Sequence, residues 1–210
     1  MALNSKYKQR ETGFALLMSL IVVGVIVTIG LTLLDLSVKQ LNLSTNARNS
    51  EISFHAANAG AECARYVRRS FADDMEAGND ITNVSCFDQT IGSVRAIAVS
   101  DSAPITEVGL DDASDAEATV YSYYYTWGTN NDRCSVIDTL VVNADIDGDG
   151  AVVNNMPVFF LGYVSSTKDC DPGSICTVVS VRGYNQACDG GSDPTPQGYG
   201  TIEREVLIEF

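Results

Sequence analysis

The sharpest polar motif in the chain is a run of three aspartates at alternate positions, Asp145, Asp147 and Asp149, followed by Gly150. Carboxylates at this spacing converge on Ca²⁺ in calcium-binding loops, where the glycine permits a tight turn. The last position of such a loop normally carries an acid that binds the ion with both oxygens, and here it is Met156. The motif predicts either a weak calcium site, the one cofactor that the sequence suggests, or a plain acidic turn.

Cysteine is the second residue type with chemistry. No two cysteines are spaced as C-x-x-C, and a single histidine is too few for a Cys–His zinc cluster. An even number favours disulfides formed in an oxidising compartment, and buried free thiols are the alternative. The sequence contains six cysteines: Cys63, Cys86, Cys134, Cys170, Cys176 and Cys188.

Connectivity among six cysteines is not fixed by their spacing. A bond between Cys63 and Cys86 would close a loop of about 22 residues and stabilise the fold by roughly 3 kcal/mol. Cys176 has two candidate partners, because Cys170 and Cys176 bracket a short turn and Cys188 follows a few residues later.

Catalytic motifs are missing from the sequence. A Ser-His-Asp or Cys-His arrangement would have to use His55, which falls inside a predicted helix. No glycine-rich phosphate loop or H-E-x-x-H motif occurs. We therefore expect a protein that is not an enzyme.

These residues follow a long apolar segment. Residues 14–34, FALLMSLIVVGVIVTIGLTLL, contain no charge and would form a helix of about 32 Å, enough to cross the hydrocarbon core of a bilayer. Lys6, Lys8 and Arg10 precede it, and short basic flanks stay in the cytoplasm, so the rest of the chain is expected outside. A cleaved signal peptide would have a shorter apolar region and a small-x-small site after it.

The charge of the chain is strongly asymmetric. From Ser70 onward there are 23 acids against five bases, within a total net charge of −14. Such a surface repels a polyanion, so we expect no nucleic-acid partner for this region.

A second helical pattern continues after the apolar segment. No proline interrupts residues 14–71, and Ile52, Ala56, Ala59, Cys63 and Tyr66 recur at helical spacing, which predicts an amphipathic continuation of one rod. Small residues around Gly60 would let a sheet approach the helix closely. Three arginines near its predicted end, which offset the helix dipole or form a partner-binding patch, are Arg65, Arg68 and Arg69.

The remainder is predicted to be rich in strands. Residues 73–85 are predicted to be a loop, and Pro157 stands where a missing N–H does no harm to a following strand. An antiparallel sheet packed on the helix gives an α+β fold. The predicted strands are 93–100, 118–127, 139–142, 158–164, 175–182 and 201–210.

One predicted strand carries an unusual aromatic run. Tyr121, Tyr123, Tyr125 and Trp127 alternate and therefore share one face. Such a face predicts half-buried core or a subunit contact, and a sugar-binding platform is the alternative.

The junction of the basic leader and the apolar segment resembles type IV pilins and pseudopilins, whose leader ends in Gly before an apolar helix that often begins with Phe. Gly13 and Phe14 match this junction, and residues 53–64, SFHAANAGAECA, resemble the AF-x-AA-x-AG-x-E run of PilX-type minor pilins. The resemblance is good over residues 7–70 and general beyond them. It implies a leader at 1–13, a transmembrane and filament-core helix at 14–34, its amphipathic continuation at 35–72, and a head domain at 73–210.

The resemblance also implies a function and partners. A prepilin peptidase would cut after Gly13 and methylate Phe14, and the apolar helix would leave membrane lipid to pack with other pilin subunits in a cell-surface filament. Most pilins carry Glu at the fifth mature position, where this chain has Met18, and an unpaired amine in an apolar core is costly. We therefore expect a minor subunit, at the tip or in initiation, whose exposed head meets other subunits, cells or surfaces. The alternatives are a type II secretion pseudopilin and a single-pass anchored binding protein that does not assemble.

Overall fold

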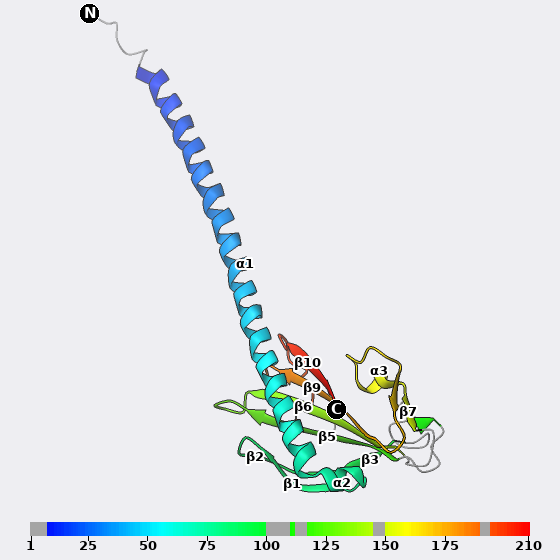
Figure 1. Cartoon of the computed structure of the whole chain (residues 1–210). Coiled ribbons are helices and arrows are strands. Elements are labelled where there is room, and N and C mark those ends of the chain that lie inside the picture. Colours follow the sequence, from blue (N-terminus) through cyan, green and yellow to red (C-terminus); the bar gives the residue numbers. More distant parts are fainter. Residues whose placement is uncertain (1–7, 100–109, 112–116, 145–149, 190–193) are drawn as a thin grey trace, which may run out of the picture. The chain divides into compact units, whose positions relative to one another are not determined.

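The computed structural model describes residues 8–99, 110–111, 117–144, 150–189 and 194–210. The chain divides into two compact units, residues 1–48 and residues 49–210. Helix α1, Lys8–Ser70, runs through the described part of the first unit and ends in the second (Figure 1). From here on we call residues 49–210 the head, which includes the end of α1 as well as the head domain predicted at 73–210, and we describe it by itself.

The head is built around an antiparallel sheet with the strand order β10-β9-β6-β5-β3. Its long central strands are rich in β-branched and aromatic residues, which pack well on a pleated surface. The predicted α+β fold, a long helix with an antiparallel sheet, is confirmed. The strands are β3 (Ala96–Ala98), β5 (Glu117–Trp127), β6 (Arg133–Asn143), β9 (Ile175–Tyr184) and β10 (Glu203–Glu209).

Two smaller groups of strands accompany the main sheet. A hairpin pairs β1 with β2, and a three-stranded sheet has the order β4-β7-β8. Two short helices, α2 and α3, complete the described head. Their bounds are α2 (Ala72–Glu76), β1 (Ile81–Cys86), β2 (Gln89–Val94), β4 (Leu110–Asp111), β7 (Ala151–Asn154), α3 (Met156–Phe159) and β8 (Thr167–Cys170).

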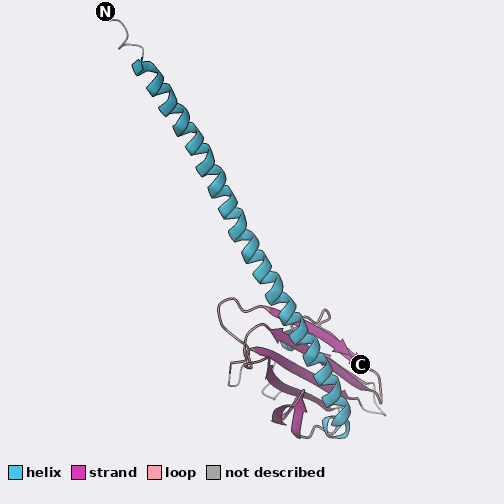
Figure 2. Cartoon of the chain, turned by 90° about the vertical axis from the view of Figure 1, so that its left-hand side faces the viewer, coloured by secondary structure: helices cyan, strands magenta, loops and turns pink. Residues whose placement is uncertain are grey.

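The end of α1 lies across one face of the main sheet (Figure 2). Where it crosses β9, a Cβ added to Gly183 would collide with backbone atoms of Ser53 and Ala57. A Cβ added to Gly60 would collide in the same way with the side chain of Val181. The predicted close approach through small helix residues is therefore confirmed, and glycines on both helix and strand make it.

Two hydroxyl groups fix the helix on the sheet. Ser53 Oγ donates to the Ile202 carbonyl at 2.6 Å, and Ser135 Oγ donates to the Ala56 carbonyl at 2.8 Å. Both serines are fully buried, so these bonds satisfy polar groups that would otherwise be costly to bury.

The core lies mainly between α1, β1 and the sheet. The alternate tyrosines of β5, Tyr121, Tyr123 and Tyr125, are buried here and pack against the buried side chains of α1 and β1. The prediction that they share one face is confirmed, and burial excludes that face as a sugar-binding platform. The predicted helix stripe is partly wrong, because Tyr66 is exposed and the buried positions are Ser53, Ala56, Ala57, Gly60, Ala61, Cys63, Ala64 and Val67.

Two segments differ from their predicted structure. Residues 158–164 are not a strand, because Asn155 has a left-handed backbone (φ 57°) and Pro157 lies in the first turn of α3, where proline favours a helix start. Residues 73–85 are not simply a loop, because they include most of α2 and the start of β1. Polar side chains at Thr82 and Asn83 on the exposed face hid this strand.

The opposite face of the sheet is covered in two patches. One patch packs under the β4-β7-β8 sheet and α3, and the other packs around Tyr184 and Cys134. Between the patches, Arg182 Nη2 donates to Asp138 Oδ2 at 2.9 Å, and Ser122 Oγ donates to Asp138 Oδ1 at 2.7 Å. Burial alone would lower the pKa of Arg182, but the neighbouring Asp138 carboxylate raises it, so the guanidinium keeps its charge.

Candidate functional sites

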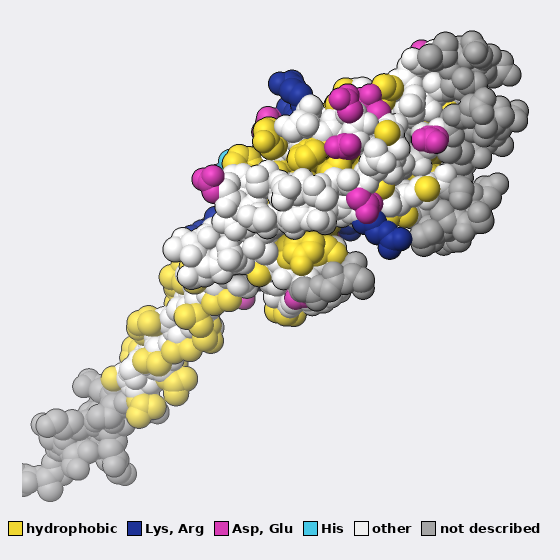
Figure 3. Space-filling model, turned by 90° about the horizontal axis from the view of Figure 1, so that it is seen from below, with side chains coloured by type: hydrophobic (Ala, Val, Ile, Leu, Met, Phe, Trp, Pro, Cys, Tyr) yellow, Lys and Arg dark blue, Asp and Glu magenta, His cyan; other side chains and the backbone are white. Residues whose placement is uncertain are grey.

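The apolar segment of α1 exposes nearly all of its side chains. Leu16, Leu20 and Leu31 are each more than three-fifths exposed, and Phe14 is 64% exposed. Figure 3 shows hydrophobic side chains gathered on the visible face of this part of the helix. By length and composition, α1 is long and apolar enough to cross a membrane.

Hydroxyl groups in this segment are satisfied within the helix. Ser19, Thr28 and Thr32 each donate to the carbonyl three residues earlier, at 2.8 to 2.9 Å. An apolar environment offers no water to replace such bonds, and unsatisfied hydroxyls are costly there. The segment therefore presents no free donor to lipid or to another apolar helix.

Three glycines lie in the exposed part of α1 without a contact inside the chain. Nothing lies within 4 Å of a Cβ added at Gly13, Gly24 or Gly30. A glycine inside a helix costs about 1 kcal/mol relative to alanine. Small residues at membrane helix surfaces let a neighbouring helix approach closely, so these positions are candidates for contacts with another chain.

The predicted processing residues Gly13 and Phe14 both lie inside α1. The Phe14 ring is exposed, and Met18 is 48% exposed on the same helix. Since Gly13 touches nothing within the chain, its glycine is not required by packing. This leaves recognition by another protein as a reason for glycine at this position.

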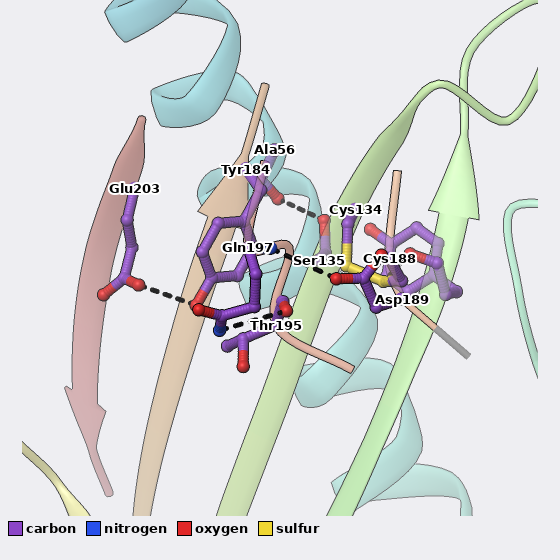
Figure 4. Close-up of a disulfide and its surroundings, with 10 residues drawn as sticks. Ala56, Cys134, Ser135, Tyr184, Cys188, Asp189, Thr195, Gln197 and Glu203 are labelled. Atoms are coloured by element: carbon purple, nitrogen blue, oxygen red, sulfur yellow. Dashed lines mark hydrogen bonds between the residues drawn. A yellow bond between two sulfur atoms is a disulfide. The ribbon is translucent and has the colours of Figure 1, made fainter. Parts of the chain in front are cut away.

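Three disulfides hold the head together. The structure joins Cys63 at the end of α1 to Cys86 at the end of β1, and it joins Cys170 to Cys176 across the turn between β8 and β9. The third bond, Cys134–Cys188, ties the segment after β9 to the start of β6 (Figure 4). These bonds resolve the two partners left open for Cys176 in favour of Cys170.

The segment after the third disulfide is folded back by local bonds. The Gln197 amide N–H donates to Asp189 Oδ2 at 3.1 Å, and the Asp189 amide N–H donates to the Pro194 carbonyl at the same distance. Beside it the Tyr184 hydroxyl donates to Glu203 Oε2 at 2.7 Å (Figure 4). Burial, together with this bond, raises the pKa of Tyr184.

The predicted calcium ligands Asp145, Asp147 and Asp149 lie outside the described residues. The chain is described up to Ala144 after β6 and again from Gly150, which has a φ of 91°. Among the described residues no group of three or more His, Cys, Asp or Glu side chains could hold a metal ion. The calcium site stays a prediction.

The remaining candidates from the sequence lie on α1. His55 is exposed, and its Nε2 lies 3.8 Å from the Glu51 carboxylate. Arg65 is paired with Glu62, and Arg68 Nη2 lies 2.6 Å from Glu76 Oε1. Arg68 is thus part of the packing between α1 and α2 rather than a free cation at the helix end.

Sequence patterns did not reveal a cavity of about 440 Å³ between β2 and β5. The cavity is lined by residues of β2, by Arg95 and by residues 122–126 of β5. The tyrosine alternation located β5, but nothing in the sequence showed which strand lies beside it. This contact is between segments far apart in the chain.

Comparison of the chain with protein-family models, with curated proteins and with solved structures gave no significant match.

Proposed function

We propose that the protein is a minor pilin-like subunit, held in the membrane by the apolar segment of α1 and assembled through that segment into a filament of the type IV pilus class. One observation carries the proposal: residues 14–34 are apolar and exposed all round, yet include glycines that no contact within the chain explains. A simple anchor needs the apolar surface alone. A helix that also packs against sister helices needs close-approach positions as well.

The same segment can serve in lipid and in a filament core. Both surroundings are apolar, so moving the helix from one to the other loses little burial. Its hydroxyl groups already bond within the helix, and they do not oppose the transfer. The disulfide-bonded, acidic head suits an oxidising compartment outside the cytoplasm.

Processing after Gly13 is the direct test. The full chain is expressed in a bacterium with and without a prepilin peptidase, and the intact mass of the membrane-bound protein is measured. We expect the peptidase to yield a chain that begins at Phe14 and carries one added methyl group. An N-terminus that remains at Met1 in the presence of the peptidase contradicts the proposal and favours a static anchored binding protein.

A matched pair of variants tests whether the peptidase recognises Gly13 itself, separately from any effect on the folding of the chain. Gly13→Val and Gly24→Val both place side chains where no atom of the chain lies within 4 Å. We expect the first to block cleavage and the second to leave it intact. Fractionation of sheared cells then distinguishes a surface filament, which is released, from a short secretion-system pseudopilin, which stays with the membrane.

A further inference from the structure

Strand β5 has an open edge in the described head. All of its residues, from Glu117 to Trp127, pair with β6, but on the other side β3 pairs only with residues 119–121. Residues 122–127 therefore have no strand partner on that side among the described residues. An open edge carries unpaired N–H and C=O groups that can accept another strand.

The direction of these groups follows from the pairing. The Val99 N–H donates to the Ala118 carbonyl at 2.8 Å, so Ala118 faces the open side. In an antiparallel ladder every second residue turns both backbone groups to the same neighbour, and the β5–β6 register is continuous. The backbone N–H and C=O groups of Ser122, Tyr124 and Thr126 thus point to the open side of β5.

The cavity described above lies along this edge. It measures about 440 Å³ and is bounded by β2 and by residues 122–126. At about 3.3 Å per residue this stretch of β5 offers roughly 15 Å of edge, enough for a short extended peptide. Strand β2 lies beside this stretch but bonds only to β1 among the described strands, so it leaves the outward backbone groups of β5 unpaired.

The charge of the cavity differs from that of the head. From Ser70 onward acids outnumber bases 23 to five, yet the described residues of the lining include Arg95 and no Asp or Glu. Arg95 is exposed and forms no ion pair with any described residue. A carboxylate brought into the cavity would meet this guanidinium instead of being repelled.

We propose that the cavity between β2 and β5 binds an extended, acid-bearing segment of a partner protein, which adds to the open edge of β5 as a strand. Backbone bonds to Ser122, Tyr124 and Thr126 provide the affinity, and an ion pair with Arg95 selects an acidic side chain. The inference does not depend on the proposed filament function, since it concerns the head alone and is tested without assembly.

The probe is a phage-displayed library of random peptides of about seven residues, selected on the full chain in lipid nanodiscs. Retained peptides are made synthetically and their binding is measured by fluorescence polarisation. We expect acidic peptides to be retained, and methylation of alternate backbone nitrogens to weaken binding by about tenfold or more, because several backbone hydrogen bonds are lost together. Retention of no peptide, or binding that N-methylation leaves unchanged, overturns the proposal.

Two variants of one residue separate backbone from side-chain binding. Tyr124→Pro removes an outward N–H and spares the β5–β6 ladder, whereas Tyr124→Ala removes the same ring and keeps the N–H. We expect the proline variant to lose binding by about fivefold relative to the alanine variant, because one backbone hydrogen bond is lost. Equal loss in both variants means that the ring carries the binding, as for a glycan or another ligand without a strand, and refutes strand addition. If the proline variant does not fold, N-methylated peptides on the unaltered chain decide.

Arg95 is tested in the same assay. Arg95→Glu should abolish selection of acidic peptides, while Arg204→Glu, on β10 at the other edge of the sheet and outside the cavity lining, should leave it unchanged. Equal effects of the two variants would show that the net charge of the protein sets the selection of acidic peptides, which contradicts a specific ion pair with Arg95.

Discussion

At the scale of single residues, the buried Tyr121 hydroxyl ties β5 to the segment around α2. The Tyr121 hydroxyl lies 3.2 Å from the Met75 carbonyl and 3.1 Å from the Asn79 carbonyl, so it links β5 to both sides of the turn after α2. Burial, with smaller effects of Asp74 and Asp80, raises the pKa of Tyr121 from 10.0 to about 12. The folded head therefore holds this phenol in its neutral form.

This pKa shift predicts a loss of stability at alkaline pH. The unfolded chain releases the proton near pH 10 and the folded chain near 12, so the stabilisation is complete below about pH 10 and falls as pH rises toward 12. Tyr121→Phe should lower stability by about 1 kcal/mol at pH 8, through the lost hydrogen bond, and should make the alkaline decline shallower. Urea unfolding at several pH values measures both effects. An identical alkaline decline in the variant would show that Tyr121 does not carry this linkage.

The stability of α1 on the sheet depends, at the scale of elements, on one crossing point. Gly183→Ala places a methyl group against the backbone of α1, which cannot move without displacing the helix. We expect a loss of about 3 kcal/mol or more, measured by chemical denaturation. Gly162→Ala is the control, because its added Cβ meets first the far end of the Glu205 side chain and then the end of Leu207, and no backbone atom. Its cost should be below about 1 kcal/mol, and a similar cost for both substitutions would show that the helix yields at the crossing.

The elements differ in how far the sequence predicts them. Helix α1 and the strands β5 and β9 were predictable, because uninterrupted helical spacing and β-branched or aromatic runs are local signals. The apolar run at 158–164 was wrongly predicted to be a strand. Its Phe160 is buried beside a short helix and turn and not in a strand of a sheet. Pairings between distant segments, such as Cys134 with Cys188 and β2 beside β5, depend on tertiary contacts that no local pattern records.

At the scale of the whole molecule, the two compact units differ in what stabilises them. The described residues of the first unit belong to one helix, and the side chains of residues 13–48 are almost all exposed. Among the described residues, the hydrophobic core clusters and the three disulfides lie in residues 49–210. The helix that could span a membrane and the contacts that fold the head thus belong to separate parts of the sequence.

This separation predicts that residues 49–210 fold without the apolar helix. The fragment keeps Ser53, Ala56 and the rest of the buried helix stripe, and its 25 acids and 8 bases keep it soluble by mutual repulsion. Produced in an oxidising compartment, it should be monomeric in gel filtration without detergent and should melt within a few degrees of the full chain in micelles. Reduction of its disulfides should lower the melting temperature clearly, because they close loops in the unfolded chain. A fragment that aggregates, or that melts far below the full chain, would mean that the first 48 residues stabilise the head. In that case the helix could not leave lipid for the proposed filament without loosening the head.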